Sequence, residues 1–256
     1  MTTASVVVHP NPDVLAESVA ARLATRIADA QAARGQASVV LTGGRIAAKF
    51  HAALCQSPVR HAIDWSRVDF WWGDERFLPA GDPDRNETQA RASLLDHLPV
   101  DPARVHPMPS SDGPAGEDPE AAAADYARRL ADHASGDDVV PRFDVVMLGV
   151  GEDAHVASLF PGQPATYEER PVVGVRGAPK PPPRRISLTF PTINSADEVW
   201  LIAAGAGKAD AVALAMSKPG PVQAPAAGVH GVSSTRWLLD RPAAAALPSR
   251  FHSLRR

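Results

Sequence analysis

Short apolar runs recur along the chain, and most of them are followed by a turn and an amphipathic segment. The run at residues 143–150, FDVVMLGV, ends in apolar residues that follow one another without polar alternation. Such continuity indicates a strand buried on both faces of a parallel sheet. Further strands are expected at Ser5–His9, Ala37–Leu41, Val68–Trp72, Val105–Met108, Val172–Val175, Ile186–Phe190, Val199–Ala203 and Arg236–Leu239.

The segments between these runs have the features of helices. Asn11 and Pro12 supply the N-cap and first-turn proline of a first helix, which Gly35 ends. Further helices are expected at residues 45–54, 86–98, 119–131 and 209–216, and in the alanine-rich stretch after Asp240. The alternation predicts an α/β fold, a three-layer αβα sandwich with a mainly parallel, doubly wound sheet. We expect one domain spanning residues 1–256.

Charged or glycine-rich segments follow four of the predicted strands and supply the candidate chemistry. In an open α/β sheet, ligands bind beyond the carboxyl ends of the strands. Several cations and a helix N-terminus suit a phosphate dianion, so a small phosphorylated ligand is predicted, with the histidine as the reactive group. The groups are Gly43, Gly44 and Arg45, then Asp74 and Arg76, then Asp153 and His155, then Lys208, with Lys180 and Arg185 on a loop stiffened by three prolines.

Composition limits the partners and the compartment. The net charge of -3 offers no basic field, so neither nucleic acid nor an anionic membrane is expected as a partner. Cys55 is the single cysteine, and no run approaches the roughly 18 apolar residues of a membrane span. The N-terminus has no basic region of the signal-peptide kind. We therefore expect a cytoplasmic protein.

Several common catalytic motifs are absent from the sequence. It has no HExxH, no paired CxxC, no carboxylate cluster with metal-ligand spacing and no GxSxG serine elbow. It also lacks a GKS or GKT phosphate loop, and residues 149–151 match only the first half of GxGxxG. We therefore expect no metal and no cofactor, and attack by water assisted by a general base is the simplest mechanism.

A series of motifs covering nearly the whole chain resembles the 6-phosphogluconolactonase family. The motifs are TGG at 42–44, WGDERF at 72–77, Asn86, LGVGEDAHVASLFPG at 148–162, PKPPPRRISLT at 179–189, GKA at 207–209 and WLLD at 237–240. The resemblance implies a cytosolic enzyme that hydrolyses 6-phosphoglucono-δ-lactone to 6-phosphogluconate in the oxidative pentose phosphate pathway. It also implies the fold of the glucosamine-6-phosphate deaminases, related to the ribose-5-phosphate isomerase type.

The resemblance further implies roles for individual residues. His155 would be the general base that removes a proton from the water attacking the lactone carbonyl, and Asp153 would orient the loop or the imidazolium. The phosphorylated sugar lactone would be met by Gly43, Gly44, Arg45, Asp74, Arg76, Asn86, Lys180, Arg185 and Lys208. We expect a monomer or a weak homodimer.

Two positions depart from the family pattern. Ala154 stands where the family usually has glycine, and alanine costs roughly 1–2 kcal/mol if the backbone there needs a positive φ. Arg45 stands where the family usually has a hydroxyl residue after the double glycine, so phosphate contacts near that turn are expected to differ.

Two other functions fit parts of the sequence. An amino-sugar-phosphate deaminase or isomerase has the same fold, but its histidine is followed by an AFNEP-like stretch with a glutamate that takes part in ring opening. Here residues 156–161 are VASLFP, with no carboxylate. A sugar-phosphate sensor without turnover is the alternative from another class; Ala154 and Arg45 favour it, and the intact Asp153–His155 pair argues against it.

Overall fold

A six-stranded parallel sheet forms the centre of the computed structural model, which describes residues 4–248 and residue 251. Its strand order is β1-β9-β8-β5-β2-β3, so β5 lies between β8 and β2 in the middle of the sheet. The strands are β1 (Ser5–His9), β2 (Ala37–Leu41), β3 (Val68–Trp72), β5 (Val145–Gly149), β8 (Glu198–Ala203) and β9 (Ser234–Asp240). The continuous apolar run therefore forms a buried central strand, as predicted.

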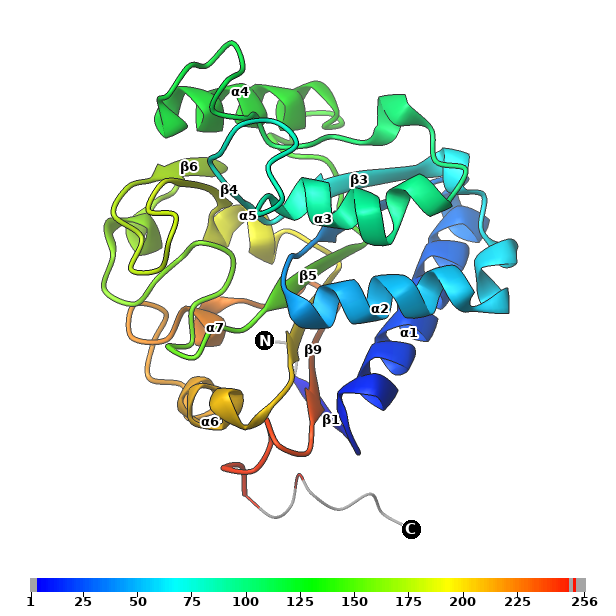
Figure 1. Ribbon diagram of the computed structural model, residues 1–256, viewed down its shortest axis with the longest axis vertical. Coiled ribbons are helices and arrows are strands. Elements are labelled where there is room, and N and C mark those ends of the chain that lie inside the picture. Colours follow the sequence, from blue (N-terminus) through cyan, green and yellow to red (C-terminus); the bar gives the residue numbers. More distant parts are fainter. Residues whose placement is uncertain (1–3, 249–250, 252–256) are drawn as a thin grey trace.

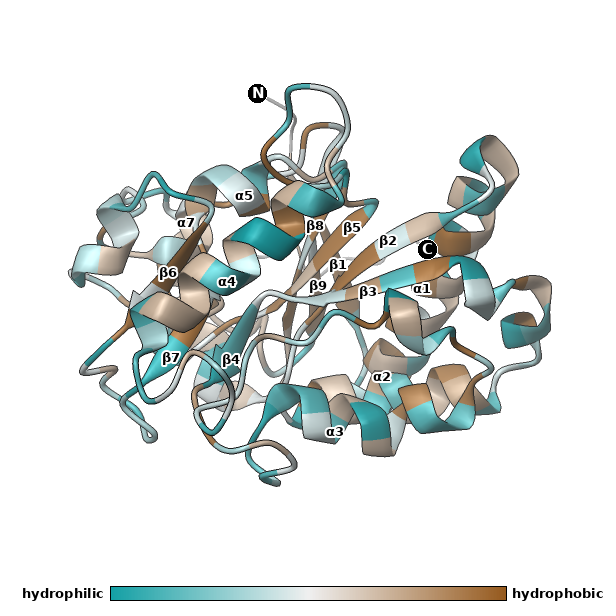
Figure 2. Ribbon diagram, turned by 90° about the horizontal axis from the view of Figure 1, so that it is seen from above, coloured by the Kyte–Doolittle hydropathy of each residue, from teal (hydrophilic) through white to brown (hydrophobic). Residues whose placement is uncertain are grey.

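Helices cover both faces of this sheet, which confirms the predicted α/β class. The helices are α1 (Pro12–Arg34), α2 (Arg45–Gln56), α3 (Asn86–Ser93), α4 (Pro119–Asp132), α5 (Phe190–Asn194), α6 (Ala209–Met216) and α7 (Pro225–Gly228). Figure 1 shows their order along the chain, and Figure 2 shows α1, α2 and α3 on one side of the sheet with α4, α5 and α7 on the other. The apolar central strands appear in brown between these layers in Figure 2.

A second, antiparallel sheet of three short strands was not predicted. It consists of β4 (Asp74–Arg76), β7 (Arg185–Leu188) and β6 (Val172–Val175), in the order β4-β7-β6. Residues 74–76 were expected only as a charged segment after the strand 68–72, and the strand now called β7 was expected to reach Phe190. That strand stops earlier because Phe190 begins α5, with Pro191 in its first turn.

Three other expected elements differ from the structure. The helix expected at 86–98 ends at Ser93, where the chain turns so that Leu94 and Leu95, adjacent in sequence, are both buried. Residues 105–108 contribute only an isolated bridge between Val105 and Phe70. The alanine-rich segment forms turns and a bend over residues 241–247. Pro248 cannot continue a helix, and the six or seven residues before it are too few for a stable one.

Candidate active site

A cavity of about 580 Å³ opens where the carboxyl ends of β2, β5 and β8 meet. Of the residues predicted from the sequence, it brings together Gly43, Gly44, Arg45, Asp74, Arg76, Asn86, His155, Arg185 and Lys208. Asp153 and Lys180 do not line it; Asp153 contacts His155, and the Lys180 Nζ lies 3.7 Å from Asp153 Oδ1. Segments that follow separate strands of the sheet therefore line the same cavity.

His155 and Asp153 form a hydrogen-bonded pair in the loop after β5. The contact joins His155 Nδ1 to Asp153 Oδ1. Because a carboxylate only accepts hydrogen bonds, Nδ1 carries the proton and the neutral ring keeps its lone pair on Nε2. The imidazole packs on Phe160, with ring centroids 4.5 Å apart, and its side chain is 18% exposed. This is the arrangement of an oriented base.

Asp153 is held in its charged form. Partial burial alone raises the pKa of this carboxyl, but the hydrogen bond and charge of His155 and the charge of Lys180 outweigh that effect. The pKa of Asp153 therefore lies well below its usual range. The charged carboxylate holds the His155 ring in place through its hydrogen bond with Nδ1.

The loop that carries this pair is tightly folded. Gly151 N donates to His155 O at 2.8 Å, and Ala154 N donates to Gly151 O at 3.1 Å. A Cβ on Gly151 would lie 1.9 Å from His155 Nδ1 and 2.5 Å from Asp153 Oδ1, so only glycine admits the pair here. Ala154 has a φ of 65°, which shows that this position does adopt the left-handed conformation.

The turn between β2 and α2 forms the opposite wall. A Cβ on Gly43 would lie 1.9 Å from Asn86 Oδ1, whereas Gly44 has open space around it but a φ of 98°. No side chain of a described residue caps α2, so the N–H groups of its first turn are left for a ligand at the cavity. Arg45, the first residue of α2, lines the cavity and forms no side-chain hydrogen bond or ion pair with a described residue.

Most of the charged side chains in the rest of the lining are basic. Arg185 binds the proline loop with Nε on Pro182 O and Nη2 on the carbonyls of Lys180 and Pro181. Arg76 lies directly opposite Arg185 on the neighbouring strand, and such like-charge pairs repel each other. Burial lowers the pKa of Arg185. An anion between these two guanidinium groups would relieve both effects.

Lys208 faces the cavity from the segment after β8. It lies in a single helical turn, Ala206–Lys208, just before α6. Burial lowers the pKa of Lys208, although the charge of Glu152 opposes that effect. A bound anion would favour the charged ammonium.

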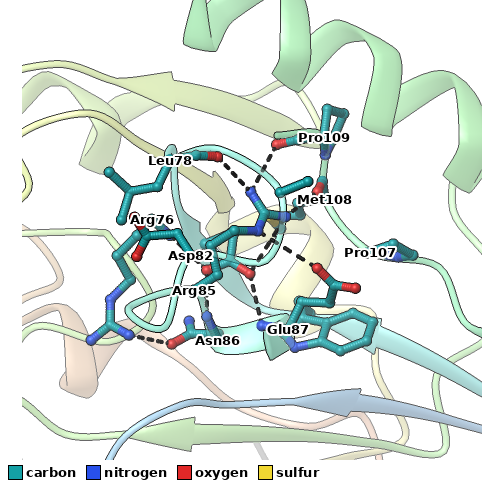
Figure 3. A network of polar contacts seen from close by, with 12 residues as sticks. Arg76, Leu78, Asp82, Arg85, Asn86, Glu87, Pro107, Met108 and Pro109 are labelled. Carbon is teal, nitrogen blue, oxygen red and sulfur yellow. Dashed lines mark hydrogen bonds and ion pairs between the residues drawn. The ribbon is translucent and has the colours of Figure 1, made fainter. Parts of the chain in front are cut away.

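Asp74 and Asn86 are fixed by neighbouring side chains. Ser158 Oγ donates to Asp74 Oδ2 at 2.7 Å, and Asn86 Nδ2 donates to the Asp74 carbonyl at 2.8 Å. Arg76 Nη1 donates to Asn86 Oδ1 at 2.6 Å, a contact drawn in Figure 3. The buried Ser158 was missed by sequence analysis, although it lies in the quoted 148–162 motif. The motif marked the segment but gave no sign that this hydroxyl turns toward β4.

Thr42 and Lys49 were also missed. Both line the cavity, and Thr42 Oγ1 accepts the Gly149 N–H at 3.2 Å, which joins the ends of β2 and β5. Thr42 belongs to the TGG motif, so its position was available from the sequence. Lys49 lies one helical turn after Arg45 on α2, and that spacing was the only indication of its place.

Residues 4–248 and 251 contain neither a metal-binding cluster nor a membrane-spanning helix. In that part of the chain, no group of three or more His, Cys, Asp or Glu side chains is arranged to hold a metal ion. None of the helices described there combines the length and the hydrophobicity that a bilayer span requires.

Comparisons with known proteins agree with this geometry. The family model for glucosamine-6-phosphate isomerases/6-phosphogluconolactonase matches residues 10–237. The 6-phosphogluconolactonase of Streptomyces coelicolor is 61% identical over 253 residues, covering 96% of this chain and 95% of that protein. The 6-phosphogluconolactonase of Mycobacterium tuberculosis is 48% identical over 248 residues, covering 96% of this chain and 100% of that protein.

Solved structures give the same result for the fold. The 6-phosphogluconolactonase of Trypanosoma brucei superposes with a TM-score of 0.83 at 29% identity, covering 97% of this chain and 100% of that one. A monomeric glucosamine-6-phosphate deaminase superposes with a TM-score of 0.78 at 20% identity, covering 94% and 99% of the two chains, which shows the shared fold. The chain therefore belongs to the glucosamine-6-phosphate isomerase/6-phosphogluconolactonase family and, within it, to the 6-phosphogluconolactonases.

Proposed function

We propose that the protein hydrolyses 6-phosphoglucono-δ-lactone to 6-phosphogluconate, the reaction of the pentose phosphate pathway that its relatives' name describes, with His155 as the general base. The observation that carries the mechanism is the Asp153–His155 pair: its hydrogen bond engages Nδ1, and His155 lines a cavity that several cationic side chains also line. A base, a place for a phosphate and a wall of polar groups for a sugar are together in one site.

The proposed reaction runs through a tetrahedral intermediate. His155 Nε2 takes a proton from water as the water oxygen bonds to the lactone carbonyl carbon, and the carbonyl oxygen becomes an oxyanion. The bond from that carbon to the ring oxygen then breaks, and the imidazolium returns its proton to the departing ring oxygen. The products are a hydroxyl and a carboxylic acid, which loses its proton to solvent. Asp153 stabilises the imidazolium between the two steps.

The cationic lining serves the phosphate. Arg76, Arg185 and Lys208 project from different segments into the cavity, together with the open N–H groups at the start of α2. Each charge-assisted hydrogen bond contributes roughly 1.5–3 kcal/mol, so a few of them hold a dianion. In this proposal Arg45 replaces the hydroxyl residue of the family pattern, and Lys180 acts on the reaction through Asp153.

In the part of the chain that the structure describes, the cavity offers no free carboxylate for the ring opening that the deaminase or isomerase alternative requires. The one carboxylate among the described lining residues is Asp74, which accepts hydrogen bonds from Ser158 and Asn86. The cytoplasmic location, the single domain and the monomeric or weakly dimeric state stay predictions.

The test is hydrolysis of freshly generated lactone by the purified protein, measured against the uncatalysed rate. We expect His155→Ala to lose roughly 10²–10⁴-fold in kcat, because a positioned base contributes about that factor, while 6-phosphogluconate still binds in calorimetry. His230→Ala, which removes an exposed imidazole, is the matched control and keeps the wild-type rate. Normal turnover by His155→Ala would exclude His155 as the base. Release of ammonia from glucosamine 6-phosphate would favour the deaminase alternative.

A further inference from the structure

Glu75 lies between two residues of the proposed substrate site but faces away from it. Asp74 and Arg76 line the cavity, and alternate residues of a strand point to opposite sides, which directs the Glu75 side chain into the protein. Its side chain has no exposed surface. A fully buried carboxylate needs several partners, because burying a charge without them is very costly. Glu75 therefore has a specific set of contacts.

The carboxylate of Glu75 caps helix α3 from a different element. Its Oε1 accepts the backbone N–H of Asn86 at 2.6 Å and of Arg76 at 2.8 Å, and its Oε2 accepts the N–H of Glu87 at 2.9 Å. Arg85, the residue at the N-cap position of α3, provides no side-chain cap. Glu75 thus satisfies N–H groups that a local capping side chain would otherwise bind, and it ties α3 to β4.

The start of α3 in turn sets the cavity wall. Asn86, the first residue of α3, holds the Arg76 guanidinium with Oδ1 and the Asp74 carbonyl with Nδ2. Its Oδ1 also fills the space beside Gly43, where a Cβ would lie only 1.9 Å away. A shift of α3 would therefore move Asn86 and release Arg76 from its present orientation.

Arg85 balances the buried charge and fastens the loop before α3. It is 1% exposed, and its Nη2 lies 3.8 Å from Glu75 Oε2. Figure 3 shows the Arg85 guanidinium directed at the carbonyls of Leu78, Met108 and Pro109, the shortest contact being 2.7 Å from Nη2 to Met108 O. Burial raises the pKa of Glu75 to about 7, and Arg85 with the three N–H groups opposes that rise.

We propose that Glu75 is a positioning residue of the lactonase: by joining β4 to the N-terminus of α3 it fixes Asn86 and Arg76 for the phosphorylated substrate. The inference rests on the proposed function, since it takes Arg76 and Asn86 as substrate-binding residues. Glu75 touches no substrate itself. Its effect is expected in substrate binding, which Arg76 and Asn86 would provide in the ground state and the transition state alike.

The test is Glu75→Gln, which keeps the size of the side chain but replaces one acceptor oxygen with an amide that cannot accept an N–H. We expect KM for the lactone to rise about 10- to 100-fold, the factor for a weakened charge-assisted contact, while kcat changes much less. The calorimetric affinity for 6-phosphogluconate is expected to fall by a similar factor. Glu87→Gln is the matched control, because it removes a carboxylate from the same helix start whose described ion pairs are with Arg85 and Arg91.

A purely structural role predicts a different result. If Glu75→Gln lowers the melting temperature but leaves KM and the 6-phosphogluconate affinity unchanged, the proposal is overturned. If that variant does not fold, Glu75→Asp replaces it. Aspartate keeps the charge facing Arg85 but is one methylene too short to bridge β4 and α3, so it too is expected to raise KM. A wild-type KM in folded Glu75→Asp would also overturn the proposal.

A double variant separates action through Asn86 from an independent effect. Combined with Asn86→Ala, Glu75→Gln is expected to raise KM by a smaller factor than it does alone, because one of the two contacts that it positions is already gone. Fully additive effects would contradict the proposal. If the wild-type protein hydrolysed no lactone, the proposed function would fail, and the 6-phosphogluconate affinities would still decide the role of Glu75.

Discussion

Ala154 adopts a left-handed backbone, with a φ of 65°, and its side chain is fully buried beside the proposed base. This conformation costs a non-glycine residue roughly 1–2 kcal/mol. Glycine avoids that cost, but its unfolded chain has more conformational freedom to lose on folding, which cancels part of the gain. Ala154→Gly is therefore expected to stabilise the fold by up to about 1 kcal/mol and to raise the melting temperature by about 2–4 °C. Calorimetric or fluorescence melting measures this.

The control for Ala154→Gly is the same substitution in an ordinary helical position. Ala127 lies within α4, where glycine costs roughly 1 kcal/mol, so Ala127→Gly should lower the melting temperature. A decrease in both variants would mean that the loop after β5 does not need the left-handed conformation in solution.

His51 is a buried histidine outside the proposed site. Its Nδ1 lies 2.9 Å from Ser93 Oγ, and the Ser93 hydroxyl donates to Gln89 O, so Nδ1 carries the proton. Nε2 is buried and has no hydrogen-bond partner in the part of the chain that the structure describes. Protonation would place an unpaired charge there, and burial accordingly lowers the pKa of His51 to about 4.

The depressed pKa of His51 predicts a loss of stability in acid. An unfolded His51 binds a proton below about pH 6.5, and the folded one does so only near pH 4, so the unfolded state binds more protons between these values. The free energy of unfolding should therefore fall by about 3 kcal/mol from this residue as the pH decreases through that window. Urea unfolding of wild type and His51→Gln at several pH values measures it. Equal pH dependence in both proteins would contradict the assignment.

At the level of elements, the predictable strands and helices were those with a continuous hydrophobic pattern and with clear capping or turn residues at their ends. Helix α1 is an example, because Asn11 caps it with hydrogen bonds to Asp13 N and Val14 N and Gly35 ends it with a left-handed residue. Strand β4 was missed because all three of its residues, Asp74–Arg76, are charged and show no hydrophobic alternation. Its pairing with β7 depends on a partner more than a hundred residues away, which local patterns do not contain.

The same limit applies to the site. The turns after β2, β5 and β8 were predictable, because glycines and charges directly follow apolar strands and parallel strand ends meet at one edge. Contacts between segments were not predictable. Neither the hydrogen bond from Ser158 to Asp74 nor the capping of α3 by Glu75 leaves a trace in residue spacing, since each joins segments brought together by the tertiary fold. Lys180 was predicted to bind the substrate, whereas in the structure it does not line the cavity and its Nζ lies 3.7 Å from Asp153 Oδ1.

On the scale of the whole molecule, local and overall charge have opposite signs. The chain carries a net charge of -3, yet basic side chains gather at the cavity. These are Arg45, Lys49, Arg76, Arg185 and Lys208, against the single carboxylate of Asp74 among the described lining residues. Four segments of the chain supply them, so the field exists only once the sheet has formed. An anionic substrate is therefore attracted to the cavity even though the protein as a whole carries a negative charge.

This charge distribution predicts how substrate binding depends on salt. The Debye length shortens from about 30 Å at 0.01 M to about 8 Å at 0.15 M ionic strength, which screens the cavity's cations from an approaching dianion. KM for 6-phosphoglucono-δ-lactone should therefore rise several-fold over that range, with kcat changed much less, because the base and its carboxylate are in contact. Glucono-δ-lactone, which has no phosphate, is the matched control, and any turnover of it should be insensitive to salt. A KM for the phosphorylated lactone that stays constant would show that its phosphate does not lie among these cations.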